Sequence, residues 1–261
     1  MAKYNMPLVD LIAYMHIYKC GGTTFNWILQ RAFPGAVLYC ENPPPIIKHV
    51  EPEQYKTFKN QTTTSYAALS SHLIRYEALN DFSYVVTTLR DPAKRLLSAF
   101  NYDVASGDCA VDLDTYIEQR VNTMTWTLGD SFIADVDSGR NYCCILEEYD
   151  LSLVCLEYYL ELNGIQVDLS APKALNLGAE KIKGGKAVSS LTAEQAKRIQ
   201  QLNQVDYDLY RAQRSKLKGI SMAIPDLENR LLDYSSRKKI AVNEINSILS
   251  YGQGPRHFTF V

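Results

Sequence analysis

Residues 16–25, HIYKCGGTTF, decide the fold that this sequence predicts. They follow the apolar run LIAYMHI (11–17) and precede the helical pattern NWILQRAF (26–33). A strand, a glycine turn and a helix start in this order are typical of a phosphate-binding loop, because N–H groups at a helix N-terminus attract anions. The lysine, however, stands before the glycines, whereas in the ATP-binding loop it follows them.

The groups expected to face the anion share this one turn. Glycines let the backbone approach a ligand closely, lysine supplies a full charge, and threonine hydroxyls add donors. A plain glycine turn with a solvated lysine is an equally open interpretation of so short a motif. The expected binding residues are Lys19, Cys20, Gly21, Gly22, Thr23 and Thr24. Neither GxxxxGK[ST] nor GxGxxG is present, which disfavours an ATP-type loop and a dinucleotide oxidoreductase.

Apolar strand patterns alternate with helical patterns, which predicts an α/β fold with a mainly parallel central sheet covered on both faces. The predicted strands are 10–17, 35–40, 65–73, 82–90 and 141–149, and the predicted helices are 23–33, 91–105, 150–164 and 191–217, the last with a break near Asn203. Segments 41–64 and 105–140 are predicted to be irregular. We expect a domain over 1–218 and a helical C-terminal extension over 219–261, which packs on the domain or on a partner chain.

Composition excludes several classes of function. The 261 residues carry a net charge of −2, with 46% hydrophobic and 21% charged residues. This balance argues against broad binding of nucleic acid or anionic membranes. The six cysteines form no CxxC pair and no histidine lies at zinc-ligand spacing, so no metal is expected. No signal peptide and no membrane-spanning apolar run are seen, and a cytoplasmic location is predicted.

A second motif, TTLRDPAKRLLSAFNY (87–102), predicts another anion site. Arg90 ends an apolar strand, and the following Asp and Pro form a good helix start. Arg95 and Ser98 are three residues apart and can share one helix face. A guanidinium and a hydroxyl at the same sheet edge suit a second phosphate. A surface salt bridge is the competing interpretation for Arg95.

Together the two segments resemble the signatures of sulfotransferases that use 3′-phosphoadenosine 5′-phosphosulfate (PAPS). HIYKCGGTTF is similar to their 5′-phosphosulfate loop, although Tyr18 stands where proline is usual and Cys20 where threonine or serine is common. The second segment is similar to their 3′-phosphate motif, Arg-x-Pro-x-x-Arg-x-x-Ser, through Arg90, Pro92, Arg95 and Ser98. The resemblance is to the carbohydrate branch, which includes heparan sulfate 2-O-sulfotransferases, and it implies a P-loop-like three-layer α/β/α fold.

Weaker similarities extend over most of residues 10–214. CCILEEYDLSLVCLEYYL (143–160) resembles the family's strand and acidic helix start, and LTAEQAKRIQQLNQVDYDLYRA (191–212) resembles its late helix with Asn-x-x-Asp-x-x-Leu-Tyr. KIKGGKA (181–187) falls where the family has a basic loop over the nucleotide. The residues implied there are Lys183, Gly184, Gly185 and Lys186, although a plain surface loop would look the same.

The resemblance implies in-line transfer of a sulfuryl group from PAPS to an acceptor hydroxyl, without a metal. Lys19 is expected to stabilise the leaving phosphate. His72 falls where the 2-O-sulfotransferase-like enzymes carry a histidine, and imidazole suits a general base. Glu41 is the rival, because it lies roughly where glucosaminyl 3-O-sulfotransferases place a catalytic carboxylate. His16, inside the first strand, is interpreted as a core residue.

Other functions stay open at this stage. A P-loop-like nucleotide kinase or phosphotransferase is the alternative enzyme, and a catalytically silent nucleotide- or glycan-binding module is the alternative outside catalysis. The acceptor is expected to be a glycan or a small molecule, although a lipid or a peptide tyrosine is also compatible. A homo-oligomer formed through the C-terminal helix is a further expectation.

Overall fold

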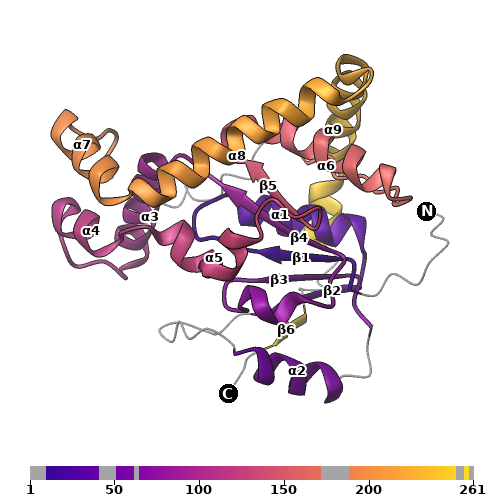
Figure 1. Ribbon diagram of the computed structural model, residues 1–261, viewed down its shortest axis with the longest axis horizontal. Helices are drawn as coiled ribbons and strands as arrows, with labels where there is room; N and C mark the ends of the chain where they lie inside the picture. Colours follow the sequence, from indigo (N-terminus) through magenta and orange to yellow (C-terminus); the bar gives the residue numbers. More distant parts are fainter. Residues whose placement is uncertain (1–9, 41–50, 62–64, 172–187, 251–255, 259–261) are drawn as a thin grey trace.

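The computed structural model describes residues 10–40, 51–61, 65–171, 188–250 and 256–258. These residues form a six-stranded sheet in the order β5-β4-β1-β3-β2-β6, and every pairing of neighbouring strands is parallel (Figure 1). The strands are β1 (Ile12–Met15), β2 (Val37–Cys40), β3 (Ala68–Ser71), β4 (Tyr84–Leu89), β5 (Asn141–Ile145) and β6 (Arg256–Phe258).

The first five strands are buried on both faces. Every residue of β1 to β5 is buried, which a strand achieves only when helices or loops cover both sides of the sheet. Register is set around the central strand, where Ile12 lies beside Ala68 of β3 and Tyr84 of β4. The predicted α/β fold with a parallel central sheet is therefore confirmed.

Most predicted helices form, and their ends follow the signals in the sequence. They are α1 (Gly22–Ala32), α3 (Pro92–Ser106), α6 (Tyr149–Leu162), α7 (Ala193–Leu202), α8 (Gln204–Ala223) and α9 (Leu227–Ser250). Thr192 and Gln195 form a capping box at the start of α7. The predicted break near Asn203 separates α7 from α8.

Two segments predicted to be irregular contain helices instead. Residues 41–64 include α2 (Pro52–Gln61), and residues 105–140 include α4 (Leu113–Gln119) and α5 (Thr123–Ala134). Pro52 stands at the first helical position, where its missing N–H costs nothing. Asp112 caps α4 by accepting a hydrogen bond from the Thr115 N–H at 2.8 Å. Local caps thus outweighed the nearby prolines and glycines from which the irregular interpretation was drawn.

A second, smaller hydrophobic cluster lies beyond the carboxyl ends of the strands, where α3, α4 and α7 gather (Figure 1). Leu96 and Phe100 of α3 pack there with Ile117 of α4 and Ile199 of α7. Short one-turn helices complete the edge: residues Tyr76–Leu79 follow β3, and residues Leu146–Glu148 follow β5. This end of the sheet is where ligands bind in open α/β folds.

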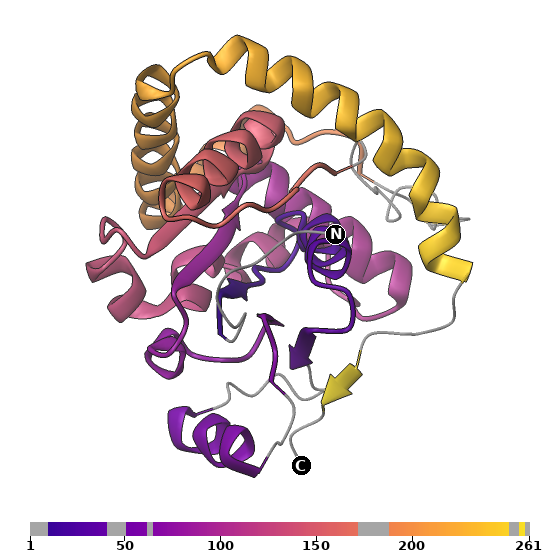
Figure 2. The ribbon, with the colours of Figure 1, turned by 90° about the vertical axis from the view of Figure 1, so that its right-hand side faces the viewer.

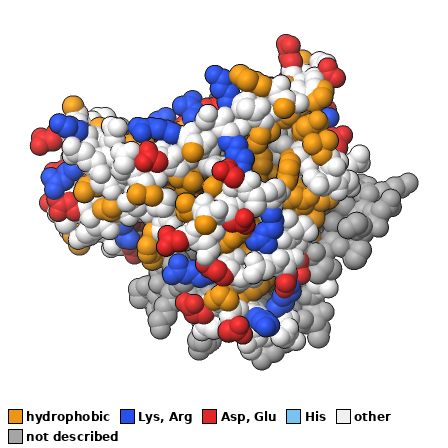
Figure 3. Space-filling model, viewed as in Figure 1, with side chains coloured by type: hydrophobic (Ala, Val, Ile, Leu, Met, Phe, Trp, Pro, Cys, Tyr) orange, Lys and Arg blue, Asp and Glu red, His pale blue; other side chains and the backbone are white. Residues whose placement is uncertain are grey.

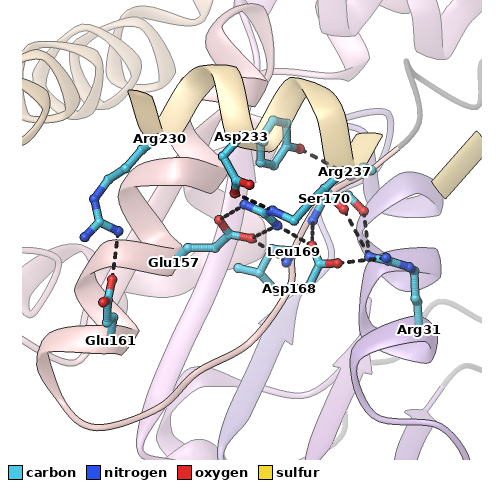
Figure 4. A network of polar contacts seen from close by, with 11 residues as sticks. Arg31, Glu157, Glu161, Asp168, Leu169, Ser170, Arg230, Asp233 and Arg237 are labelled. Carbon is cyan, nitrogen blue, oxygen red and sulfur yellow. Dashed lines mark hydrogen bonds and ion pairs between the residues drawn. The ribbon is translucent and has the colours of Figure 1, made fainter. Parts of the chain in front are cut away.

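Ion pairs between side chains join the C-terminal helix α9 to the rest of the chain (Figure 4). Arg237 contacts Glu157 of α6 at 2.8 Å and also pairs with Asp168, and Asp168 pairs with Arg31 of α1 at 2.7 Å. Figure 2 shows α9 running over this side of the molecule toward β6. The proposed boundary at residue 218 lies inside α8, and residues 256–258 of the extension form a strand that was not predicted.

The surface mixes charges of both signs. Figure 3 shows acidic and basic side chains interspersed over one face, with apolar areas between them, including a continuous stretch at the upper right of the view. In the part of the chain that the structure describes, every helix is too short or too polar to cross a membrane.

Candidate functional site

The turn between β1 and α1 has the shape that its glycines require. Gly21 has a φ of 86°, in the left-handed region that favours glycine, and Lys19 also has a positive φ of 63°. Gly21 occupies the cap position of α1, and no side chain caps this helix. No side chain therefore occupies the first N–H groups of α1, although the Thr24 N–H is bonded to the Gly21 carbonyl at 3.0 Å, and the helix dipole favours an anion at this end.

Gly22 is required for a different reason. A Cβ atom at this position would lie 1.7 Å from Nε2 of His16, which is far inside van der Waals contact. The imidazole of His16 is 8% exposed and fills the space beside the start of α1. At Gly21 a Cβ would also meet Cδ1 of Leu146 at 2.6 Å. Because Gly21 and Gly22 have no Cβ, the side chains of Leu146 and His16 can pack directly against the loop.

Lys19 is half-buried and held from two sides. Its ammonium lies 4.0 Å from the ring centroid of Tyr102 and 5.8 Å from that of Tyr18. Its backbone carbonyl accepts a hydrogen bond from Nη1 of Arg90 at 3.1 Å. Partial burial, followed by the nearby Arg90 charge, lowers the pKa of Lys19. Burial removes water from the ammonium and Arg90 adds like charge, and a bound anion would offset both effects.

The tyrosine that departs from the resemblance has a structural partner. The hydroxyl of Tyr18 donates to the carboxylate of Asp103 in α3, and the hydroxyl of Tyr116 donates to the same carboxylate at 2.6 Å. Asp103 is 8% exposed. The contact ties the glycine loop to α3, so Tyr18 fixes the loop by hydrogen bonding where a proline would fix it by restricting φ.

The second motif places its three polar residues at different depths. Arg90 and Ser98 are half-buried. Asp91 caps α3 by accepting a hydrogen bond from the Lys94 N–H at 3.0 Å. The side chain of Arg95 is 1% exposed and its Nη2 donates to Oγ1 of Thr123 at 3.1 Å, while its Nε has no partner. Arg95 therefore lies in the interior between α3 and α5, and its contact with a phosphate stays a prediction.

The geometry of His72 fixes its tautomer. Its Nδ1 lies 2.5 Å from the backbone carbonyl of His16. A carbonyl only accepts hydrogen bonds, so Nδ1 carries the hydrogen and the neutral ring keeps its lone pair on Nε2. The ring also stacks on His16, with centroids 3.6 Å apart. Burial, then the proximity of His72 and Lys19, lowers the pKa of His16, which keeps the supporting ring neutral.

Sheet order brings these groups to one edge. Lys19 follows β1, Arg90 follows β4 and His72 follows β3, and β4, β1 and β3 are consecutive strands. Because all three strands are parallel, their carboxyl ends meet. Two cations, an uncapped helix start and an imidazole with a fixed lone pair thus share one edge. The arrangement suits binding of an anionic group and removal of a proton beside it.

Cysteine and threonine side chains of the loop contribute less. Burial raises the pKa of the Cys20 thiol to about 12, so this residue is a passive small side chain and no thiolate forms near neutral pH. Thr24 is buried and Thr23 is exposed. Among the described residues no group of three or more acidic, histidine or cysteine side chains is placed to hold a metal ion.

Some predicted residues cannot be placed. Glu41 and the basic loop residues Lys183, Gly184, Gly185 and Lys186 lie outside the described residues. Two neighbours of the site were missed by the sequence analysis. Tyr102 lies one helical turn after Ser98, a spacing that could have identified it. Asp103 gave no signal, because its partner Tyr18 lies 85 residues earlier in the chain.

The sequence model of the sulfotransferase family matches residues 4–123. Both loops of the site lie within this sulfotransferase match. The comparison with curated proteins found no match in sequence. Among solved structures, mouse sulfotransferase SULT7A1 complexed with PAP matches with a TM-score of 0.53 and 12% identity, over 85% of this chain and 91% of that chain. A sulfotransferase from Alicyclobacillus acidocaldarius matches with a TM-score of 0.46 and 9% identity, over 77% and 94%.

The family match covers the part of the fold that carries the candidate site. The matched sequence runs from before β1 to the start of α5, and it includes Lys19, His72 and Arg90. The likeness to the mouse sulfotransferase shows the fold alone, since its identity is only 12%. The family match is the finding that points to a sulfotransferase, and the structural likeness adds the fold.

Proposed function

We propose that the chain transfers a sulfuryl group from PAPS to an acceptor hydroxyl. The observation that carries the proposal is the juxtaposition of Lys19, Arg90 and His72 at one sheet edge, inside the segment that matches the sulfotransferase family. A nucleotide that is phosphorylated at its 5′ and 3′ positions suits two separate anion-binding loops. The mouse sulfotransferase of similar fold was solved with PAP, adenosine 3′,5′-bisphosphate.

The proposed reaction balances with these residues alone. The acceptor oxygen attacks sulfur, the bond from sulfur to the 5′-phosphate oxygen breaks, and PAP leaves with the bonding electrons. Nε2 of His72, the ring atom that keeps the lone pair, takes the hydroxyl proton. Lys19 and the N–H groups at the start of α1 stabilise the charge on the departing phosphate. Arg90 and Ser98 bind the 3′-phosphate.

We further propose a carbohydrate as the acceptor. Support comes from the order and content of the two motifs, which resemble the carbohydrate branch of the family. The direct experiment is a screen of glycans, small alcohols, lipids and tyrosine peptides with labelled PAPS and the purified protein. Transfer of label to glycans alone supports the proposal. Transfer to another class of acceptor would overturn the carbohydrate proposal but still support sulfuryl transfer.

Nucleotide preference is the first expected result. Calorimetry should show that the protein binds PAP more tightly than ATP with Mg²⁺, because Lys19 precedes the glycines and no Lys-Thr pair follows them. We also expect PAP to bind at least tenfold more tightly than adenosine 5′-monophosphate (AMP), since a charged hydrogen bond to the 3′-phosphate contributes roughly 1.5–3 kcal/mol. A preference for MgATP would make the kinase interpretation the better one.

The Arg90→Ala variant tests the 3′-phosphate loop. We expect PAP affinity to fall about 10- to 100-fold, because one charge-assisted contact is lost, and AMP affinity to fall much less. Calorimetry with both nucleotides measures the difference. Lys94→Ala is the matched control, because Lys94 belongs to the same motif but is exposed. An equal loss for PAP and AMP would assign Arg90 to general support of the loop.

A further inference from the structure

The turn after β5 supports both anion-binding loops. Because β5 is the neighbour of β4, residues that follow β5 lie beside the turn that carries Arg90. Leu146 touches the first loop, where its Cδ1 approaches Gly21. The carboxylate of Glu147 accepts the backbone N–H of Asp91 through both oxygens, at 3.2 and 3.4 Å. The proposed function assigns no role to Glu147.

Glu147 is itself held by a residue from a distant part of the chain. The hydroxyl of Tyr210 in α8 donates to Oε2 of Glu147 at 3.0 Å, although the two residues lie 63 positions apart. Burial, then the Glu147 charge, raises the pKa of Tyr210, so its hydroxyl stays protonated and keeps donating. Glu147 is exposed, so without this contact its carboxylate would be free to turn into solvent.

Helix α8 is anchored firmly enough to serve as a support. One turn before Tyr210, the carboxylate of Asp206 is fully buried. It accepts the N–H groups of Met124 at 3.0 Å and Thr125 at 2.8 Å, at the start of α5. These are helix-capping contacts made by a residue of another helix. The Asn-x-x-Asp-x-x-Leu-Tyr motif therefore places its aspartate on α5 and its tyrosine on the turn after β5.

The contact at Asp91 reaches Arg90 through the backbone. Asp91 is held at its N–H by Glu147, at its carbonyl by the N–H of Arg95 (2.9 Å), and at its side chain by the N–H of Lys94 (3.0 Å). The preceding Arg90 is then fixed at its backbone, while its guanidinium rests on the Lys19 carbonyl. A turn constrained in this way holds the guanidinium in place before a ligand arrives.

We propose that Glu147, held by Tyr210, is a positioning residue that sets Arg90 for the 3′-phosphate of the donor. The inference rests on the proposed function, because it assumes that Arg90 binds this phosphate. Glu147 makes no contact with the nucleotide in this scheme. Its effect is confined to the affinity for the 3′-phosphate, which Arg90 binds.

Tyr210→Phe is the decisive variant, because it removes the hydroxyl and leaves every charge unchanged. The readout is the ratio of AMP to PAP dissociation constants, measured by calorimetry. We expect the ratio to fall about 2- to 5-fold, as expected for one hydrogen bond to a partly solvated carboxylate. General destabilisation would weaken PAP and AMP alike and would leave the ratio unchanged. The unfolding temperature of each variant is recorded alongside.

A double-mutant cycle tests whether the Tyr210 hydroxyl acts through Glu147. In a Glu147→Ala background, Tyr210→Phe is expected to leave the ratio unchanged, because the hydroxyl has lost its acceptor. Equal effects in both backgrounds would overturn the proposal. Arg214→Gln is the matched control, since Arg214 pairs with the adjacent Glu148 from the same helix; its ratio should equal that of the wild type. Failure of the proposed function is distinguishable from these outcomes, because the unmodified protein would then bind PAP no more tightly than AMP.

Discussion

Replacing His72 with asparagine is expected to lower kcat by about 100- to 10,000-fold, the usual contribution of a general base, with unchanged PAP affinity. Asparagine can still donate to the His16 carbonyl through its amide, so the stacked pair at the edge keeps its shape, but it has no basic nitrogen. Turnover is measured with labelled PAPS and the acceptor found by the screen, and affinity by calorimetry.

Glu41→Ala separates the two candidate bases. If His72 is the base, this variant keeps most of its turnover while His72→Asn loses it. The reverse pattern would transfer the role to Glu41.

Lys19→Met is the second large effect. Methionine is unbranched and similar in length, but it removes the charge that the leaving phosphate requires. We expect kcat to fall about 100- to 1,000-fold, as when a preorganised donor at a developing charge is lost. PAP affinity should fall less than kcat, since the N–H groups of the loop still bind the 5′-phosphate.

Two further variants sharpen the interpretation. Lys19→Arg keeps a positive charge over the Tyr102 ring and should recover part of the rate. Lys197→Met removes an exposed lysine of α7 that the proposed reaction does not use and should behave as the wild type. If Lys19→Met weakens PAP affinity and leaves kcat unchanged, the lysine binds the ground state and the transition state equally and gives the transition state no extra stabilisation.

The local signals in the sequence predicted the parts of the site that local chemistry determines. A β-branched run ending at Arg90 and followed by Asp91 and Pro92 could only be a strand that leads into a capped helix. The glycine pair after β1 likewise fixed the position of the first loop. Even the interruption at Asn203 was visible, because asparagine and its polar neighbours weaken a helix.

Contacts between distant segments could not be predicted in this way. Nothing near Tyr18 indicates that its hydroxyl reaches Asp103, and nothing near Glu147 indicates Tyr210, because these pairs form only after the sheet and α8 are assembled. Strand β6 is a similar case, since three residues near the end of the chain extend the sheet only by meeting β2. Such pairings depend on tertiary context rather than on propensity.

The contact between His16 and Gly22 also limits which substitutions the two positions can accept. Since the ring of one residue occupies the volume that a Cβ of the other would need, the two positions do not vary independently. A lineage that acquires a side chain at position 22 has to shorten residue 16 first or lose the loop. Residue 16 in turn stacks on the imidazole of His72, so substitution of a single glycine is restrained by a residue that follows a different strand, β3.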